Sequence, residues 1–163
     1  MNIRHSLLRS LKHARRATED FLVAFKTPAD WTHQPAPGTN HALWVVGHLG
    51  VIDNFFIAAI DPSRKLKHAR LQELCTMGTE PQSNPDVYPP AEEALAYMRE
   101  RRTALLALLD TLTDDDLDKP TRPGTPAFLP DVGSIFEAAI WHEGLHAGQV
   151  SVARRSLGHR PLR

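Results

Sequence analysis

The sequence holds a single cysteine, Cys75, no long apolar run and no surplus of either charge. One cysteine excludes a disulfide within the chain and is typical of a reducing compartment, so we expect a cytoplasmic protein. No apolar run approaches the roughly 20 residues that span a bilayer, so we expect no membrane segment. Lys plus Arg and Asp plus Glu number 19 each, and no basic block indicates a nucleic-acid partner.

The chain has enough apolar residues for one folded domain. It is 163 residues long and 42% hydrophobic, so we expect a single domain over residues 1–163. Its first residues are basic without an acidic partner, as in a cleavable mitochondrial leader. However, an apolar stripe continues past Glu19 and Asp20, which favours a helix of the mature protein. The stripe consists of Ile3, Leu7, Leu11, Ala14, Phe21 and Phe25.

Apolar residues spaced three and four apart predict four long helices. The first helix covers roughly residues 2–26 and ends before Pro28. The second begins after Asn40, a natural N-cap, and stops at Asp61-Pro62. The third begins with Pro90 at its first position and carries an apolar stripe to Leu112. The fourth covers residues 135–157, with a capping box from Ser134 and Glu137.

The connections between these helices complete the predicted fold. No segment alternates with period two, so we expect no sheet. The connection over residues 61–89 is long enough to cross the whole molecule, with a short helix near 64–75, and would let the second and third helices run parallel. The sequence therefore predicts an all-α four-helix bundle with a long crossover between helices two and three. Loops 61–89 and 113–133 have no predictable conformation.

Three histidines lie where a helical core would bury them. The segment from Trp141 to Val150 contains H-E-x-x-H, which places His142 and His146 one turn apart on the apolar face of its helix. His48 occupies the same kind of position on the second helix. Burying three imidazoles is costly unless each has a partner, and one metal ion would serve all three. Three histidines with an open fourth position describe a catalytic zinc site. The alternative is three core histidines held by ordinary hydrogen bonds.

The same H-E-x-x-H pattern occurs in zinc peptidases, which take a third ligand from further along the chain. In the extended form a Gly and a His would fall at positions 149 and 152, where this chain has Gln149 and Val152. No acidic residue follows Glu143, so the form with a downstream glutamate also fails. The sequence therefore argues against a peptidase.

Several short motifs together resemble the DinB/YfiT-like superfamily. They are W-x-x-G-H-L from Trp44 to Leu49, H-x-x-x-H-x-G-Q from His142 to Gln149, and R-x-x-L-G from Arg154 to Gly158. The resemblance implies a four-helix bundle in which His48, His142 and His146 hold a divalent metal. It also implies metal-dependent hydrolase-like activity or the use of a low-molecular-weight thiol, and a homodimer. Glu143 is not part of the superfamily pattern.

Other polar residues near the predicted site have two possible roles each. Glu143 could act as a catalytic base toward metal-bound water, or could face a neighbouring helix, because it lies about 100° around the helix from His142. Arg102 interrupts an apolar stripe and could bind an anionic substrate or reach solvent. Asp53 and Gln149 could orient ligands by hydrogen bonds or make ordinary surface contacts.

Four further side chains receive simpler interpretations. We expect Trp44 and Trp141 to be core aromatics around the metal. His41 would face solvent beside the Asn40 cap or line the mouth of the site. Cys75 has no evident histidine partner and is expected to be inert.

The leading hypothesis for function is a metal-dependent enzyme of hydrolase type that acts on a small molecule through metal-bound water. The second is thiol-dependent transfer or isomerisation at the same metal, which would bind the cofactor as thiolate. The third is a non-catalytic module that binds metal or a small ligand. We expect one divalent metal per chain, with zinc or nickel as the best candidates.

Overall fold

The computed structural model describes residues 3–162, and every long element in this range is an α-helix. The four long helices are α1 (Ile3–Leu22), α3 (Ala42–Ile60), α5 (Ala91–Thr111) and α7 (Val132–Ser156). The short elements are α2 (Pro28–Trp31), α4 (Ala69–Cys75) and α6 (Asp114–Leu117), with single 3₁₀ turns η1 (Pro62–Arg64) and η2 (Pro85–Val87). No strand occurs within residues 3–162, so the expected all-α fold is confirmed. The predicted helix start at residue 2 lies outside the described residues.

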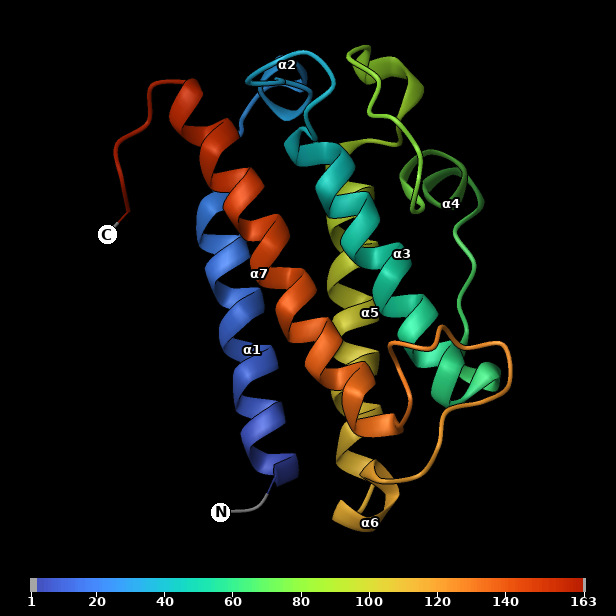
Figure 1. Cartoon of the computed structure of the whole chain (residues 1–163). Helices are drawn as coiled ribbons and strands as arrows, with labels where there is room; N and C mark the ends of the chain where they lie inside the picture. The colour runs from blue at the N-terminus through green and yellow to red at the C-terminus, as the bar shows by residue number, and fades with distance from the viewer. Residues whose placement is uncertain (1–2, 163) are drawn as a thin grey trace.

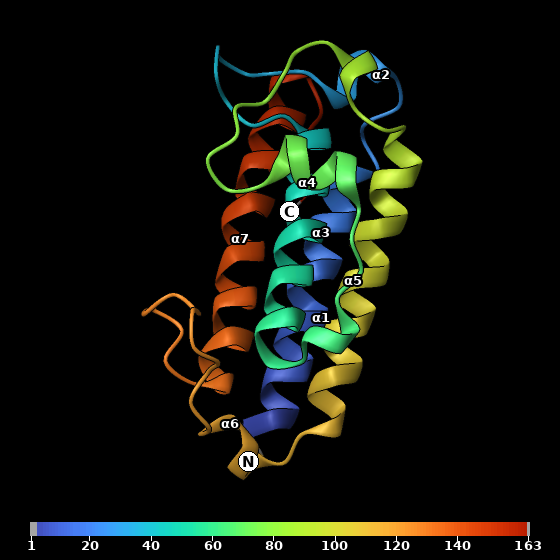
Figure 2. The same ribbon diagram turned by 90° about the vertical axis from the view of Figure 1, so that its right-hand side faces the viewer.

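The four long helices form a bundle in which each has two neighbours. Helix α1 packs against α7 and α5, and α3 packs against α5 and α7 (Figure 1). Helices α1 and α7 run in one direction, while α3 and α5 run in the other. The connection after α3 returns along the outer face of that helix through η1 and α4 before α5 begins (Figure 2). Helices α3 and α5 are therefore parallel, and the returning segment covers part of α3.

The helix starts differ from the predicted ones by one to three residues. His41, not Asn40, caps α3, since its Nδ1 accepts from the Trp44 backbone N–H at 3.1 Å. The His41 ring is fully buried and its Nε2–H donates to the Gln82 carbonyl, which corrects the expectation that it faces solvent or the mouth of the site. Pro90 caps α5 and is not its first residue.

Helix α7 also begins earlier than predicted, at Val132 and not at residue 135. Asp131 is its N-cap and accepts from the Ser134 backbone N–H at 2.8 Å. Ser134 is instead the third helical residue and completes the capping box from inside the helix. Both Asp131 and Ser134 are good N-cap residues, so the local sequence alone does not separate the two starts.

The apolar core consists of two clusters stacked along the bundle. One lies toward α2 and includes Leu22, Trp44, Met98 and Val150. The other lies toward α6 and includes Leu11, Ile52, Leu105 and Ala139. Along each long helix, the two clusters are separated by buried polar residues. These are Arg15 and Thr18 on α1, His48 and Asp53 on α3, Arg101 and Arg102 on α5, and Glu143 and His146 on α7.

Helix α3 is the most apolar part of the chain. By length and by a mean hydropathy of 1.7 it could span a membrane, contrary to the expectation that no segment qualifies. However, 78% of this helix is buried inside the bundle, as expected of the core helix of a soluble protein.

Candidate metal centre

The structure brings His48 of α3 together with His142 and His146 of α7. The Nε2 atom of His142 lies 3.0 Å from Nε2 of His48 and 3.1 Å from Nε2 of His146. The same three residues form a group whose ligand atoms all lie within 4.8 Å of one another. The three histidines that helical periodicity places on apolar faces therefore meet in space.

Two of these imidazoles have a fixed tautomer. His48 Nδ1–H donates to the Cys75 carbonyl oxygen at 2.7 Å, and His146 Nδ1–H donates to Gln149 Oε1 at 2.8 Å. Because the hydrogen sits on Nδ1 in both rings, Nε2 carries a lone pair in both. Carbonyl groups that hold Nδ1 in this way are typical partners of metal-binding histidines.

The convergence of three Nε2 atoms is better explained by a cation than by hydrogen bonds. A single hydrogen on His142 Nε2 could be donated to His48 or to His146, but not fully to both. Two nitrogens bound to one zinc ion at about 2.0–2.1 Å with tetrahedral angles lie about 3.3 Å apart, close to the separations seen here. The donor set therefore fits a divalent metal.

The protonation of the site also fits a metal. Burial lowers the pKa of His48 to about 4. Burial, and then the neighbouring imidazoles, lower the pKa of His142 to about 3. Burial also lowers the pKa of His146. The three rings are therefore neutral at pH 7, which is the form that binds metals.

The surroundings of the histidines fix their orientation. Trp44 stacks on His48 with ring centroids 4.5 Å apart, as expected of a core aromatic beside the site. Gln149 Oε1 also accepts from Asn40 Nδ2 at 3.1 Å, so the predicted orienting role of Gln149 agrees with its contacts. Cys75 contacts His48 through its backbone carbonyl and not through its thiol, so the contact does not contradict the expectation of an inert thiol.

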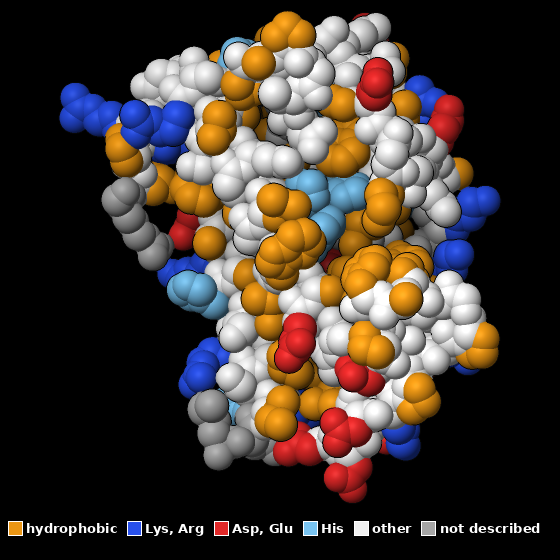
Figure 3. Space-filling view, viewed as in Figure 1, with side chains coloured by type: hydrophobic (Ala, Val, Ile, Leu, Met, Phe, Trp, Pro, Cys, Tyr) orange, Lys and Arg blue, Asp and Glu red, His pale blue; other side chains and the backbone are white. Residues whose placement is uncertain are grey.

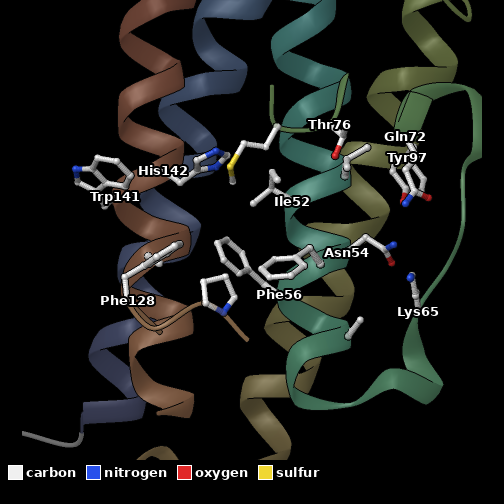
Figure 4. Close-up of a pocket in the computed structure, with 16 residues that line it drawn as sticks. Ile52, Asn54, Phe56, Lys65, Gln72, Thr76, Tyr97, Phe128, Trp141 and His142 are labelled. Carbon is white, nitrogen blue, oxygen red and sulfur yellow. The ribbon is translucent and has the colours of Figure 1, made fainter. Parts of the chain in front are cut away.

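A cavity of about 450 Å³ opens beside the site, and His142 forms part of its wall. In the space-filling view, histidine side chains reach the surface at the bottom of a hollow between hydrophobic side chains (Figure 3). Trp141 lies at the same end of the cavity as His142 (Figure 4). Its side chain is 68% exposed, which corrects the expectation of a core aromatic. It lies one residue before His142 and therefore points about 100° away from the metal-facing side.

Glu143 and Arg102 belong to a buried ion network and not to this cavity wall. Arg15 donates from Nε and Nη2 to the two oxygens of Glu143, each at 2.9 Å. Arg102 donates from Nε and Nη2 to both oxygens of Asp53, at 2.8 and 3.0 Å. Arg102 Nη2 also reaches Glu143 at 2.7 Å, and Arg15 Nη2 reaches Asp53 at 3.2 Å. Each of the four long helices contributes one member.

These contacts correct the expected placement of Arg102 and Asp53, and for Glu143 they favour the alternative that it faces neighbouring helices. Glu143 has no exposed surface and faces α1 and α5, where two arginines occupy both its oxygens. Burial alone raises its pKa, but the charges of Arg15 and Arg102 outweigh this effect and lower the pKa to about 2. Arg102 binds two carboxylates of the protein, and Asp53 orients these arginines and not a histidine. Sequence reasoning missed Arg15.

The comparisons with known proteins agree with the helical fold. The sequence model of the DinB superfamily matches residues 10–150. The chain belongs to the DinB superfamily. This superfamily commonly binds metal, and His48, His142 and His146 form a cluster that could hold a metal ion.

One solved structure shares the fold of this chain at low sequence identity. A crystal structure of a conserved protein from Enterococcus faecalis superposes with a TM-score of 0.78 at 19% identity. The match covers 98% of this chain and 99% of the other, so the two share the fold over their whole length. No curated protein matches the chain.

Proposed function

We propose that this DinB protein is a metal-dependent enzyme of hydrolase type that acts on a small molecule at His48, His142 and His146. The observation that carries the proposal is the convergence of three Nε2 atoms next to a cavity of about 450 Å³. Zinc or nickel is the proposed metal, because imidazole nitrogen suits both.

The residues of the chain supply binding and orientation. A divalent metal with an open position lowers the pKa of a bound water toward about 7 and so makes a nucleophile available at neutral pH. The Cys75 carbonyl and Gln149 hold two of the histidines with Nε2 directed inward. Phe56 and Trp141 line the adjoining cavity and would exclude bulk water from an apolar substrate.

A non-catalytic role has less support than an enzymatic one. A module that only stores a structural metal would enclose it, as closed four-ligand sites do. Here His142 lies on the wall of an open cavity, and three histidines leave a further position for a substrate or water.

Thiol-dependent transfer is the second candidate, and one observation favours it. Among the described residues that line the cavity there is no carboxylate, and Glu143 is held by two arginines. A general base for hydrolysis is therefore not evident at the wall. A metal deprotonates a bound thiol directly, so that chemistry requires no protein base.

Activity assays on zinc- and nickel-loaded protein would separate these functions. One panel would contain small esters, amides and lactones, and the other would contain electrophiles with a low-molecular-weight thiol. We expect hydrolysis by the wild type and by His159→Ala, whose histidine lies outside the cluster, and none by His142→Ala. Turnover only in the presence of thiol would favour transfer. Equal hydrolysis by His142→Ala would contradict a reaction at this site.

A further inference from the structure

The cavity beside the metal centre has an apolar middle and two different ends. His142 and Trp141 lie at one end, and Asn54, Lys65 and Gln72 lie at the other (Figure 4). Between them lie apolar side chains such as Ile52 and Phe56, and Phe128 adds to the apolar wall beside Trp141 (Figure 4). A ligand that fills this space therefore meets a metal-binding end, an apolar middle and a polar end.

Asn54 presents a fixed hydrogen-bond donor at the polar end. Its side chain is 5% exposed, and its Oδ1 accepts from the Leu66 backbone N–H at 2.9 Å and from Arg101 Nη1 at 3.2 Å. Two donors on Oδ1 fix the orientation of the amide, so Nδ2 must be the other terminal atom. Within residues 3–162, Nδ2 has no hydrogen-bond acceptor. No fully buried side-chain nitrogen or oxygen in this range lacks a partner, so Nδ2 must retain some accessible surface. Its hydrogens are therefore available to a ligand.

Lys65 brings a positive charge to the same end from a segment whose backbone is held in place. The Arg64 carbonyl accepts from Arg101 Nη1 at 3.0 Å, and the Leu66 carbonyl accepts from the Tyr97 hydroxyl at 2.9 Å. Lys65 lies between these two anchored residues. Its ammonium forms no ion pair with any residue of the described chain, and the cavity has no carboxylate that could neutralise it.

From this arrangement we infer that the enzyme binds a substrate with an apolar body and a terminal carboxylate, which Lys65 and Asn54 recognise at the end of the cavity away from His142. The inference rests on the proposed function, because the reacting end of that substrate lies at the three-histidine site. One ammonium and one amide donor match the single charge of a carboxylate. The apolar middle gives affinity by burial of the substrate body.

The spacing along α3 indicates the scale of the substrate. Asn54 follows His48 by six residues, which is about 9 Å along a helix at ~1.5 Å per residue. The carboxylate and the metal-binding group are therefore separated by an extended chain of several carbons, and small acids without such a chain cannot reach both ends.

A pair of probes tests this inference on the zinc-loaded full chain. Suberic acid monohydroxamate has a metal-binding hydroxamate at one end and a carboxylate at the other. Octanohydroxamic acid has the same chain length and the same hydroxamate, but ends in a methyl group. Calorimetric titration would give the dissociation constant of each compound for the wild type, Lys65→Gln, Lys65→Arg and Lys67→Gln. Lys67 is an exposed lysine of the same segment that does not line the cavity, so its variant is the matched control.

We expect the wild type, Lys65→Arg and Lys67→Gln to prefer the carboxylate compound, and Lys65→Gln to lose about fivefold of that preference. All four proteins should bind octanohydroxamic acid equally. If the wild type binds both compounds equally, or if Lys65→Gln keeps the full preference, the inference is wrong while the metal site stands. If zinc-loaded wild type binds neither compound, the open metal site of the proposed function fails as well.

Discussion

Arg15 of α1 binds both carboxylate oxygens of Glu143 of α7 at 2.9 Å, although 128 residues separate them in the sequence. Glu143 is adjacent in sequence to His142, yet its carboxylate is directed into the bundle while His142 reaches the cavity. The H-E-x-x-H segment therefore contributes to two different structures. Its histidines form the candidate metal centre, and its glutamate joins the network that ties the four helices together.

The charges of the buried network balance one another. Two arginines and two carboxylates sum to zero, and each carboxylate receives hydrogen bonds from both arginines. The layer lies between the two apolar clusters, beside the histidines. Removal of one member would leave an uncompensated charge in a largely buried position.

The first prediction is that Glu143→Gln lowers stability more than it lowers metal binding. The amide cannot compensate two buried arginines, so the free energy of unfolding should fall by about 3 kcal/mol. Urea denaturation would measure this, and elemental analysis should still find the metal. Glu137→Gln, an exposed change on the same helix, should stay within about 0.5 kcal/mol of wild type. Wild-type stability in Glu143→Gln would show that the network contributes little.

The second prediction concerns Gln149 as the partner of His146. Gln149→Leu removes the acceptor that fixes Nδ1–H, so zinc affinity should fall about 10- to 100-fold. Gln149→Glu keeps an acceptor oxygen and should retain most of the affinity. Competition with a chromogenic chelator measures both. If the leucine variant binds zinc as tightly as wild type, the hydrogen bond does not orient the ligand.

A third prediction contrasts two glycines in helices. At Gly47 an added Cβ would lie 2.5 Å from Cys75 Sγ, next to the carbonyl that holds His48. Gly47→Ala should therefore cost about 1–3 kcal/mol of stability. At Gly144 an added Cβ meets nothing within 4 Å, so Gly144→Ala should stabilise α7 by about 0.5–1 kcal/mol. Thermal unfolding of both variants checks the sign of each effect, and a harmless Gly47→Ala would contradict the packing described.

The helices and the grouping of the histidines could be predicted because both follow from periodicity. His48, His142 and His146 occupy core-facing positions of two helices, and a burial argument selects them without knowledge of any loop. The same reasoning missed Arg15. It follows Leu11 by four residues and precedes Leu22 by seven, so it lies on the buried face, but Ala14 was the more natural member of an apolar stripe.

The remaining errors arose where several residues offered similar chemistry or where loops decide the outcome. Asn40 and His41 can both cap α3, and only the tertiary contact of His41 with Gln82 favours one of them. Trp141 was predicted to lie in the core because large aromatic side chains are usually buried. The loop before α7 brings Phe128 beside the same cavity, so Trp141 forms part of an open wall. Loop conformation was not predictable from the sequence.

Metal content is the measurement that tests the account most directly. Protein would be purified without a histidine tag or chelator and analysed by elemental mass spectrometry beside His142→Ala and, as a control, His159→Ala. We expect about one divalent metal per chain in the wild type and in His159→Ala, and little in His142→Ala. No metal in the wild type, even after incubation with zinc or nickel, or equal occupancy in His142→Ala, would contradict the three-histidine centre.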